Sequence, residues 1–195
     1  SISHRALILS ALAEGPSEVT GLLEGDDVLA TARALGQVGV KIDITKGERC
    51  LVQGRGLTGL TPPTAPLDLG NSGTGFRLLS AVLAGQPFAS TLIGDHSLRK
   101  RPMTRIIDPL TLMGATINSG KGGYPPLNIL GRYPLSSIEY ELPIASAQTK
   151  SAVLLAGLNE NGVTRVREPA QTRAHTENML IGFGCPVEVG DGVIS

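Results

Sequence analysis

The chain has 195 residues, of which 41% are hydrophobic and 17% charged, a balance that is typical of a folded domain rather than a disordered segment. Its 17 basic and 17 acidic residues cancel, which argues against a general binder of nucleic acids or membrane surfaces, so any anion recognition must be local. Aromatic residues make up only 3%, and no apolar stretch is long enough to span a bilayer.

One order of elements occurs three times along the chain. Each copy starts with small polar residues and an apolar helix, continues with a β-branched strand and a second helix, and closes with a strand that follows a glycine. The helices open at SISHRALILSALAEG, NSGTGFRLLSAVLAG and ASAQTKSAVLLAGL, and the closing glycines are Gly39, Gly114 and Gly184. This repeat predicts a single α/β domain of three units, roughly residues 1–60, 67–130 and 138–195, with pseudo-threefold character.

Local signals in the first unit support this order of elements. Apolar residues at helical spacing predict a first helix that ends near Gly15. Asp26 and Asp27 are N-cap candidates for the second helix, and Gly39 suits its C-terminal end. Residues 41–44 alternate between polar and apolar types, which predicts a half-exposed strand.

The second unit contains a proline and a cationic cluster at the start of its second helix. Pro102 is expected in the first turn of that helix, where its missing N–H costs nothing. Beside it lie Arg99, Lys100, Arg101 and Arg105. Positive charge at a helix N-terminus opposes the macrodipole, so the cluster indicates that an anion binds nearby.

Three helix N-termini combine small polar residues with a nearby cation. They lie at residues 1–5, 70–75 and 146–148, and Arg5 and Arg173 occupy comparable positions beside them. Helix N-termini offer free N–H groups and partial positive charge, and guanidinium holds a phosphate or carboxylate with two parallel bonds. If the three units are related by rotation, these N-termini point toward one centre. The sequence therefore predicts one anion-binding face, although each serine alone could be an ordinary cap.

Other motifs do not indicate a site. The three histidines have no metal-ligand spacing, Gly70-xx-Gly73-x-Gly75 is not a dinucleotide fingerprint, and no pair of nucleophile and base is recognisable. Cys50 and Cys185 lie far apart, as is typical of free thiols in a cytosolic protein, and no secretory signal opens the chain. We expect a cytoplasmic location, no metal and no organic cofactor.

The motifs resemble those of a known family. SISHRALILSALAEG, LDLGNSGTGFRLLSAVLAG, GDHSLRKRPMTRIIDPL, SAQTKSAVLLAGL and TRAHTENML are similar to successive motifs of 5-enolpyruvylshikimate-3-phosphate (EPSP) synthases, and look most like the bacterial class tolerant of glyphosate. That family transfers an enolpyruvyl group from phosphoenolpyruvate to shikimate 3-phosphate and releases phosphate, in the shikimate pathway that leads through chorismate to the aromatic amino acids. The resemblance implies an inside-out α/β domain of three βαβαββ units.

The resemblance also implies a shikimate 3-phosphate site. Carried over by motif position, Ser1 and Arg5 would contact the ring and carboxylate side of this substrate. Ser146, the backbone of Ala147 and Arg173 would hold its 3-phosphate. These residues come from the helix N-termini and arginines that the charge pattern already indicates.

A phosphoenolpyruvate site is implied next to it. Gly73 would line the pocket, Arg101 would grip the phosphate, and Gln148 would lie between the two ligands. Glyphosate would occupy the same pocket as an inhibitor, and an alanine methyl at Gly73 would narrow that pocket. An alternative role for Gly73 is a backbone conformation with positive φ.

The resemblance is incomplete at both ends of the chain. The lysine that precedes the first serine in the family is absent, and so is the second domain, which supplies the acidic proton-transfer residues. We therefore expect an excised N-terminal half that binds its substrates without turnover and has a complementary C-terminal domain as partner. The alternatives are a relative of UDP-N-acetylglucosamine enolpyruvyl transferase, a non-catalytic module that binds anionic metabolites, and a purely structural repeat domain.

Overall fold

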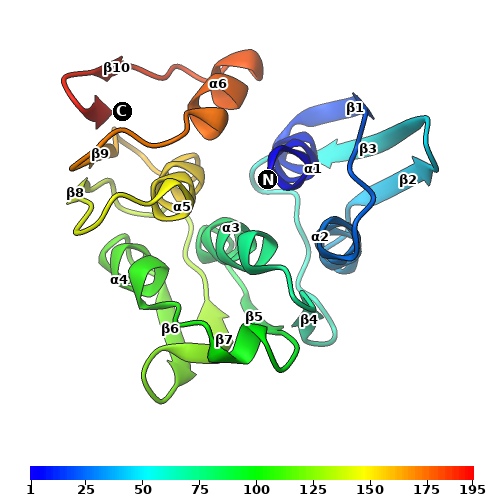
Figure 1. Cartoon of the computed structure of the whole chain (residues 1–195), viewed down its shortest axis with the longest axis horizontal. Coiled ribbons are helices and arrows are strands. Elements are labelled where there is room, and N and C mark those ends of the chain that lie inside the picture. The colour runs from blue at the N-terminus through cyan, green and yellow to red at the C-terminus, as the bar shows by residue number, and fades with distance from the viewer.

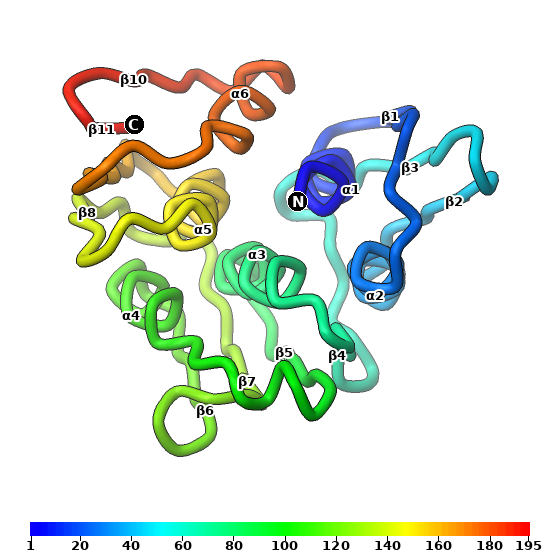
Figure 2. The backbone as a smooth tube through the Cα atoms, viewed as in Figure 1, coloured from blue at the N-terminus to red at the C-terminus, as the bar shows by residue number.

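The computed structural model describes residues 1–195 and contains three small β-sheets and six α-helices (Figure 1). The chain runs once around a common centre, so that the three repeat units follow one another from blue through green to red (Figure 2). The first unit has the elements α1 (Ile2–Leu12), β1 (Glu14–Thr20), α2 (Asp26–Gln37), β2 (Lys41–Thr45) and β3 (Arg49–Arg55).

The second and third units repeat one topology. In each, the first two strands are parallel and the last two pair antiparallel, with sheet orders β4-β5-β7-β6 and β8-β9-β11-β10. The first unit starts at its first helix and has the three-stranded order β1-β3-β2. The elements of the second unit are β4 (Leu67–Asp68), α3 (Gly73–Ala84), β5 (Ala89–Ile93), a 3-10 turn (Leu98–Lys100), α4 (Thr104–Leu112), β6 (Thr116–Gly120) and β7 (Tyr124–Leu130). Those of the third are β8 (Glu139–Glu141), α5 (Ala147–Gly157), β9 (Arg165–Arg167), α6 (His175–Gly182), β10 (Val189–Gly190) and β11 (Val193–Ile194).

The helices lie inside and the sheets outside (Figure 1). Helices α1, α3 and α5 are buried on almost every face, which explains why their sequences are apolar all round rather than along one stripe. Their side chains join those of the sheets in one hydrophobic cluster of 42 buried residues, nearly all aliphatic. The prediction of the α/β class is confirmed.

The three closing glycines end the second helix of each unit in the same way. Gly39, Gly114 and Gly184 have φ of +94°, +111° and +86°, the left-handed conformation that glycine adopts without steric cost. In each unit the N–H of the residue after the glycine donates to the carbonyl five residues earlier, which satisfies an otherwise orphaned group of the helix end: Val40 to Leu35, Ala115 to Leu110 and Cys185 to Leu180.

Three local predictions were wrong in position. Asp26 and Asp27 lie inside the first turn of α2, whose N-cap is Gly25, and neither carboxylate caps the helix. Helix α1 ends at Leu12, because Gly15 with its φ of +82° pairs with β3 as part of β1. Pro102 lies just outside α4, whose N-cap is Met103. Local propensity places such boundaries only to within a few residues.

The thiols of Cys50 and Cys185 are free. None of the helices combines the length and the apolar character needed to cross a bilayer.

Candidate anion-binding site

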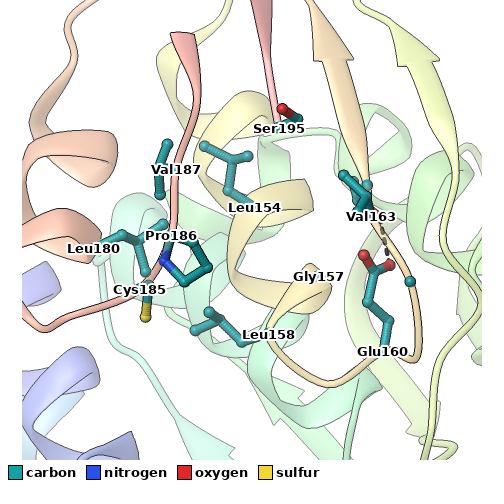
Figure 3. A pocket seen from close by; sticks show the side chains of 12 residues that line it. Leu154, Gly157, Leu158, Glu160, Val163, Leu180, Cys185, Pro186, Val187 and Ser195 are labelled. Carbon is teal, nitrogen blue, oxygen red and sulfur yellow. Dashed lines mark hydrogen bonds between the residues drawn. The ribbon is translucent and has the colours of Figure 1, made fainter.

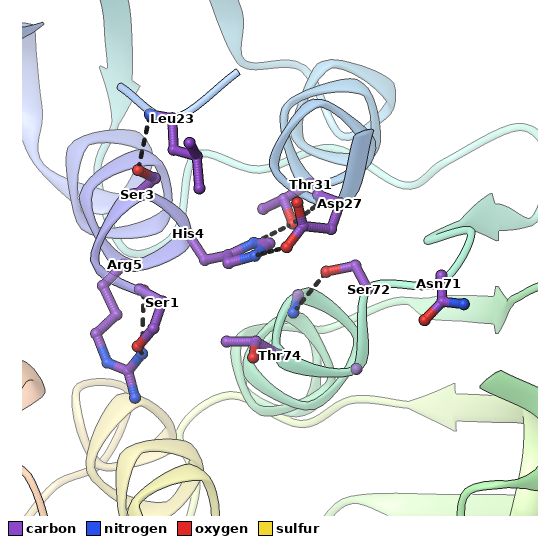
Figure 4. A network of polar contacts seen from close by, with 12 residues as sticks. Ser1, Ser3, His4, Arg5, Leu23, Asp27, Thr31, Asn71, Ser72 and Thr74 are labelled. Carbon is purple, nitrogen blue, oxygen red and sulfur yellow. Dashed lines mark hydrogen bonds and ion pairs between the residues drawn. The ribbon is translucent and has the colours of Figure 1, made fainter. Parts of the chain in front are cut away.

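The N-termini of α1, α3 and α5 lie on one face of the helix layer. Gln148, the second residue of α5, donates from Nε2 to Oγ1 of Thr74, the second residue of α3, over 3.0 Å. Arg5 in the first turns of α1 points toward α5 (Figure 4) and donates from Nη2 to Oγ of Ser151 over 2.8 Å. Because the first turns of the three helices touch, their partial positive charges converge.

The serines at these N-termini have different roles. Ser72 and Ser146 are N-caps whose Oγ atoms accept from the N–H groups of Gly75 and Thr149. Ser1 is the N-cap residue of α1, but its Oγ accepts from Arg5 Nη1 instead of a backbone N–H. The first N–H groups of each helix have no intrahelical acceptor and can serve an anion.

Three arginines surround the N-terminus of α3. Arg77 Nη1 donates to Oε1 of Gln148 over 2.9 Å and to the carbonyl of Gly73 over 3.3 Å. Arg101 Nη2 donates to the side chain of Asn71. Burial lowers the pKa of Arg77, and the neighbouring positive charges of Arg101 and Arg105 lower this pKa further. These guanidiniums repel one another, so an anion between them would be stabilised.

Arg5 of α1 and Arg173, just before α6, add two further guanidiniums. Arg5 is only 3% exposed, and its Nε donates to Oγ1 of Thr176 over 2.6 Å. Burial lowers the pKa of Arg5, and the positive charge of Arg173 lowers it further. Arg173 itself is exposed and forms neither a hydrogen bond nor an ion pair. Its donors are free for a ligand, whereas most donors of Arg5 bind the protein.

None of these five arginines has an acidic partner. The ion pairs of the chain join other residues, and several lie on the outer strands. A chain of zero net charge thus keeps five unneutralised guanidiniums at one helix-terminal face. Mutual repulsion at such a face is offset when anions bind.

Gly73 leaves room for two guanidiniums. A Cβ on this residue would lie 2.9 Å from Nη1 of Arg101 and 3.1 Å from Nη1 of Arg77. Gly73 is not among the glycines with positive φ, so the conformational alternative is wrong. A methyl group here would press directly on the two guanidiniums that flank the α3 N-terminus.

The candidate residues therefore gather on one face, together with side chains that sequence reasoning missed. Arg77 follows Gly73 by four residues on α3, and this helical spacing could have indicated it. Ser151, Thr176 and Lys150 had no local signal. Lys150 in particular sits in an apolar helix, where its burial depends on acidic partners from elsewhere in the chain.

His4 ties α1 to α2 beside this face (Figure 4). Its Nδ1 lies 2.8 Å from Oγ1 of Thr31, and its Nε2 lies 3.1 Å from Oδ2 of Asp27. One neutral tautomer satisfies both contacts, with Nε2–H donating to the carboxylate and Nδ1 accepting from the hydroxyl. The ring is 1% exposed, and this burial lowers the pKa of His4 despite the carboxylate of Asp27.

Stability should consequently fall as the solution is acidified. Below the ordinary histidine pKa of 6.5, His4 binds a proton in the unfolded chain but stays neutral in the folded chain. The unfolded state then binds more protons, so the free energy of unfolding decreases with falling pH. We expect urea denaturation between about pH 7 and about pH 5 to show a weaker pH dependence for His4→Asn than for the wild-type chain. His96→Asn, at an exposed position, should retain the wild-type slope. Equal slopes for all three proteins would contradict this assignment.

One apolar pocket has no arginine in its lining (Figure 3). Its volume is about 280 Å³, and it is lined by Leu154 and Leu158 from the C-terminal half of α5, by Leu180 of α6 and by residues of the following segment. Its one charged side chain, Glu160, accepts a hydrogen bond from Thr164. It offers nothing that would orient a phosphate.

Taken with the fold, the converging helix N-termini and unpaired arginines give this α/β chain one face that is suited to anions. No cluster of histidine, cysteine and acidic side chains in it could hold a metal ion. The chain belongs to the EPSP synthase (3-phosphoshikimate 1-carboxyvinyltransferase) family, whose sequence profile matches residues 1–194.

Individual relatives support this assignment. The chain is 61% identical over 187 residues to the 3-phosphoshikimate 1-carboxyvinyltransferase of Alkalilimnicola ehrlichii, and 61% identical over 188 residues to that of Acidithiobacillus ferrooxidans. Each match covers 96% of this chain but only 42% and 43% of the relative. The structure of an EPSP synthase from Acinetobacter baumannii is 49% identical, with a TM-score of 0.96 over 99% of this chain and 44% of that one. The chain thus spans less than half the length of these relatives, and the family resemblance read from the sequence is confirmed.

Proposed function

We propose that the chain is the N-terminal substrate-binding domain of an EPSP synthase, which converts shikimate 3-phosphate and phosphoenolpyruvate to 5-enolpyruvylshikimate 3-phosphate and phosphate. The domain would be a single inside-out unit of three pseudo-symmetric βαβαββ repeats and would act in the cytoplasm. The observation that carries this proposal is the set of five arginines without acidic partners around three helix N-termini.

Shikimate 3-phosphate would bind between α1, α5 and α6. The free N–H groups that follow the Ser146 cap, at Ala147 and Gln148, and the unpartnered guanidinium of Arg173 suit its phosphate. Arg5 keeps few free donors, so its contribution to the ring and carboxylate side would be chiefly its positive charge and its hold on the hydroxyl of Ser1.

Phosphoenolpyruvate, or glyphosate in its place, would bind at the N-terminus of α3. Arg101 lies beside Gly73, and Arg77 adds a second guanidinium on the other side of the same glycine. Gln148 connects the two ligand positions, since its amide belongs to α5 but bonds Thr74 and Arg77 of α3. An anion at either position would neutralise charge felt by the other.

We propose further that this chain alone binds but does not turn over its substrates. Enolpyruvyl transfer needs groups that move protons to and from the reacting carbon and oxygen atoms. The buried carboxylates nearest the site, Glu168 and Glu177, both pair with Lys150 and are not available. The acid and base would then come from a complementary C-terminal domain.

Titration of the 195-residue chain with shikimate 3-phosphate tests the proposal. We expect salt-sensitive binding in calorimetry, with amide NMR shifts at Ala147 and Gln148, and much weaker binding of shikimate, which lacks the phosphate. Adding phosphoenolpyruvate should release no inorganic phosphate. Equal affinity for shikimate, or unmoved resonances at these helix N-termini, would rule out the site. Tighter binding of UDP-N-acetylglucosamine would favour the related enolpyruvyl transferase, and phosphate release would refute the inactivity of the chain.

A further inference from the structure

A buried ion cluster links α5 to residues on either side of Arg173 in the sequence. Lys150 is 1% exposed, and its Nζ lies 2.6 Å from Oε1 of Glu177 and 3.2 Å from Oε2 of Glu168. Lys150 belongs to the first turns of α5, Glu168 follows β9, and Glu177 lies in α6. The cluster therefore joins three segments that are adjacent only in the folded chain.

On one side of the cluster, Glu168 is hydrogen-bonded to the residue before Arg173. The second carboxylate oxygen of Glu168, Oε1, accepts a short hydrogen bond from the hydroxyl of Thr172. Thr172 is the residue immediately before Arg173, in the irregular segment between β9 and α6. The guanidinium of Arg173 has no hydrogen-bond or ion-pair partner within the protein. The bond from Thr172 to Glu168 is therefore the side-chain hydrogen bond nearest to Arg173 along the chain, and it fixes the backbone beside this arginine.

On the other side of the cluster, the sequence neighbours of Glu177 and Lys150 are hydrogen-bonded to Arg5. Glu177 is preceded by Thr176, whose Oγ1 accepts from Nε of Arg5 and lies 2.7 Å from Oγ of Ser151. Ser151 in turn follows Lys150 and accepts from Nη2 of Arg5. Lys150 is thus the junction of two sets of polar contacts: one ends at the guanidinium of Arg5, and the other ends at Thr172, the residue before Arg173.

Burying three charges is costly, because each ion loses several kcal/mol of hydration that the pairing only partly restores. Apolar side chains at all three positions would avoid this cost. A positional role explains the charges better, because the two ion pairs fix the segment before Arg173 and the start of α6, where Thr176 accepts from Arg5.

We propose that Lys150, Glu168 and Thr172 form a positioning relay that fixes the backbone beside Arg173, so that the Arg173 guanidinium is already placed for a phosphate monoester before the ligand binds. This inference rests on the proposed function, since it concerns the same shikimate 3-phosphate position. The three residues act through Arg173 and do not themselves contact the ligand. Preorganisation of this kind raises affinity by removing the cost of ordering the segment during binding.

Thr172→Val in the 195-residue chain tests the relay. The substitution keeps the shape of the side chain and leaves the buried charges paired, so the fold should persist with an almost unchanged melting temperature. We expect shikimate 3-phosphate to bind about fivefold more weakly in calorimetry, the effect of one hydrogen bond. In the Arg173→Ala background, the same substitution should cause no further weakening, because the relay then has nothing to position.

Thr164→Val is the matched control. Thr164 also donates to a glutamate four residues away, Glu160, but beside the apolar pocket of Figure 3. Its loss should leave binding unchanged. Equal weakening by Thr172→Val with and without Arg173, or no weakening in the presence of Arg173, would overturn the relay while the proposed function stands. If Arg173→Ala itself has no effect, the proposed phosphate position is wrong, and the relay is refuted with it.

Discussion

Lys150→Met is expected to lower the free energy of unfolding by about 3–5 kcal/mol, the cost of leaving buried charge without its partner. Glu168 and Glu177 would then face each other with side chains 6% and 4% exposed and no ammonium between them. One oxygen of Glu177, Oε2, already lacks a hydrogen-bond partner, so the carboxylate has little other support. Urea denaturation followed by circular dichroism measures the loss.

Two further variants make this result interpretable. Lys121→Met changes the same residue type at an exposed position in the turn between β6 and β7, and should cost almost nothing. Adding Glu168→Gln and Glu177→Gln to Lys150→Met removes the uncompensated charges and should recover part of the stability. A loss below about 1 kcal/mol for Lys150→Met would mean that the cluster behaves like a surface ion pair. Its burial would then have no energetic consequence.

Arg173→Ala is expected to weaken binding of shikimate 3-phosphate at least tenfold, which corresponds to about 1.4 kcal/mol. The guanidinium is exposed and forms no hydrogen bond or ion pair within the protein, so its removal should hardly change the melting temperature. A charge-assisted bond to phosphate is worth about 1.5–3 kcal/mol, and this side chain can form two. Calorimetry at low and moderate salt gives the affinity and its salt dependence.

Two further variants test whether the position of the Arg173 charge matters or only its presence. Arg173→Lys keeps the charge but loses the two-pronged geometry, and should recover only part of the affinity. Arg132→Ala removes an exposed arginine near Gly114, at the opposite end of the helices, and should leave binding unchanged. Equal effects of Arg132→Ala and Arg173→Ala would reveal a general charge effect and contradict a specific phosphate position.

Local chemistry explains why so much was predictable. The repeat, the capping serines Ser72 and Ser146 and the closing glycines depend on interactions within a few residues, as the identical bonds at the three helix ends show. Such interactions depend on short segments, so the α/β class and the serine caps of α3 and α5 follow from the sequence. The same locality places the boundaries imprecisely, as at Pro102 and Asp27.

The sequence by itself determined the repeated units, their helix ends and the family to which the chain belongs. Only the tertiary structure decided which charges are neutralised. Arg5 meets Thr176 across 171 positions of sequence, and Lys150 finds Glu168 and Glu177 on other segments, so nothing local distinguishes these residues from the free Arg173. The physical reason is that an ion's hydration, pairing and effective charge depend on every group within a few ångströms, and packing of distant segments sets those distances.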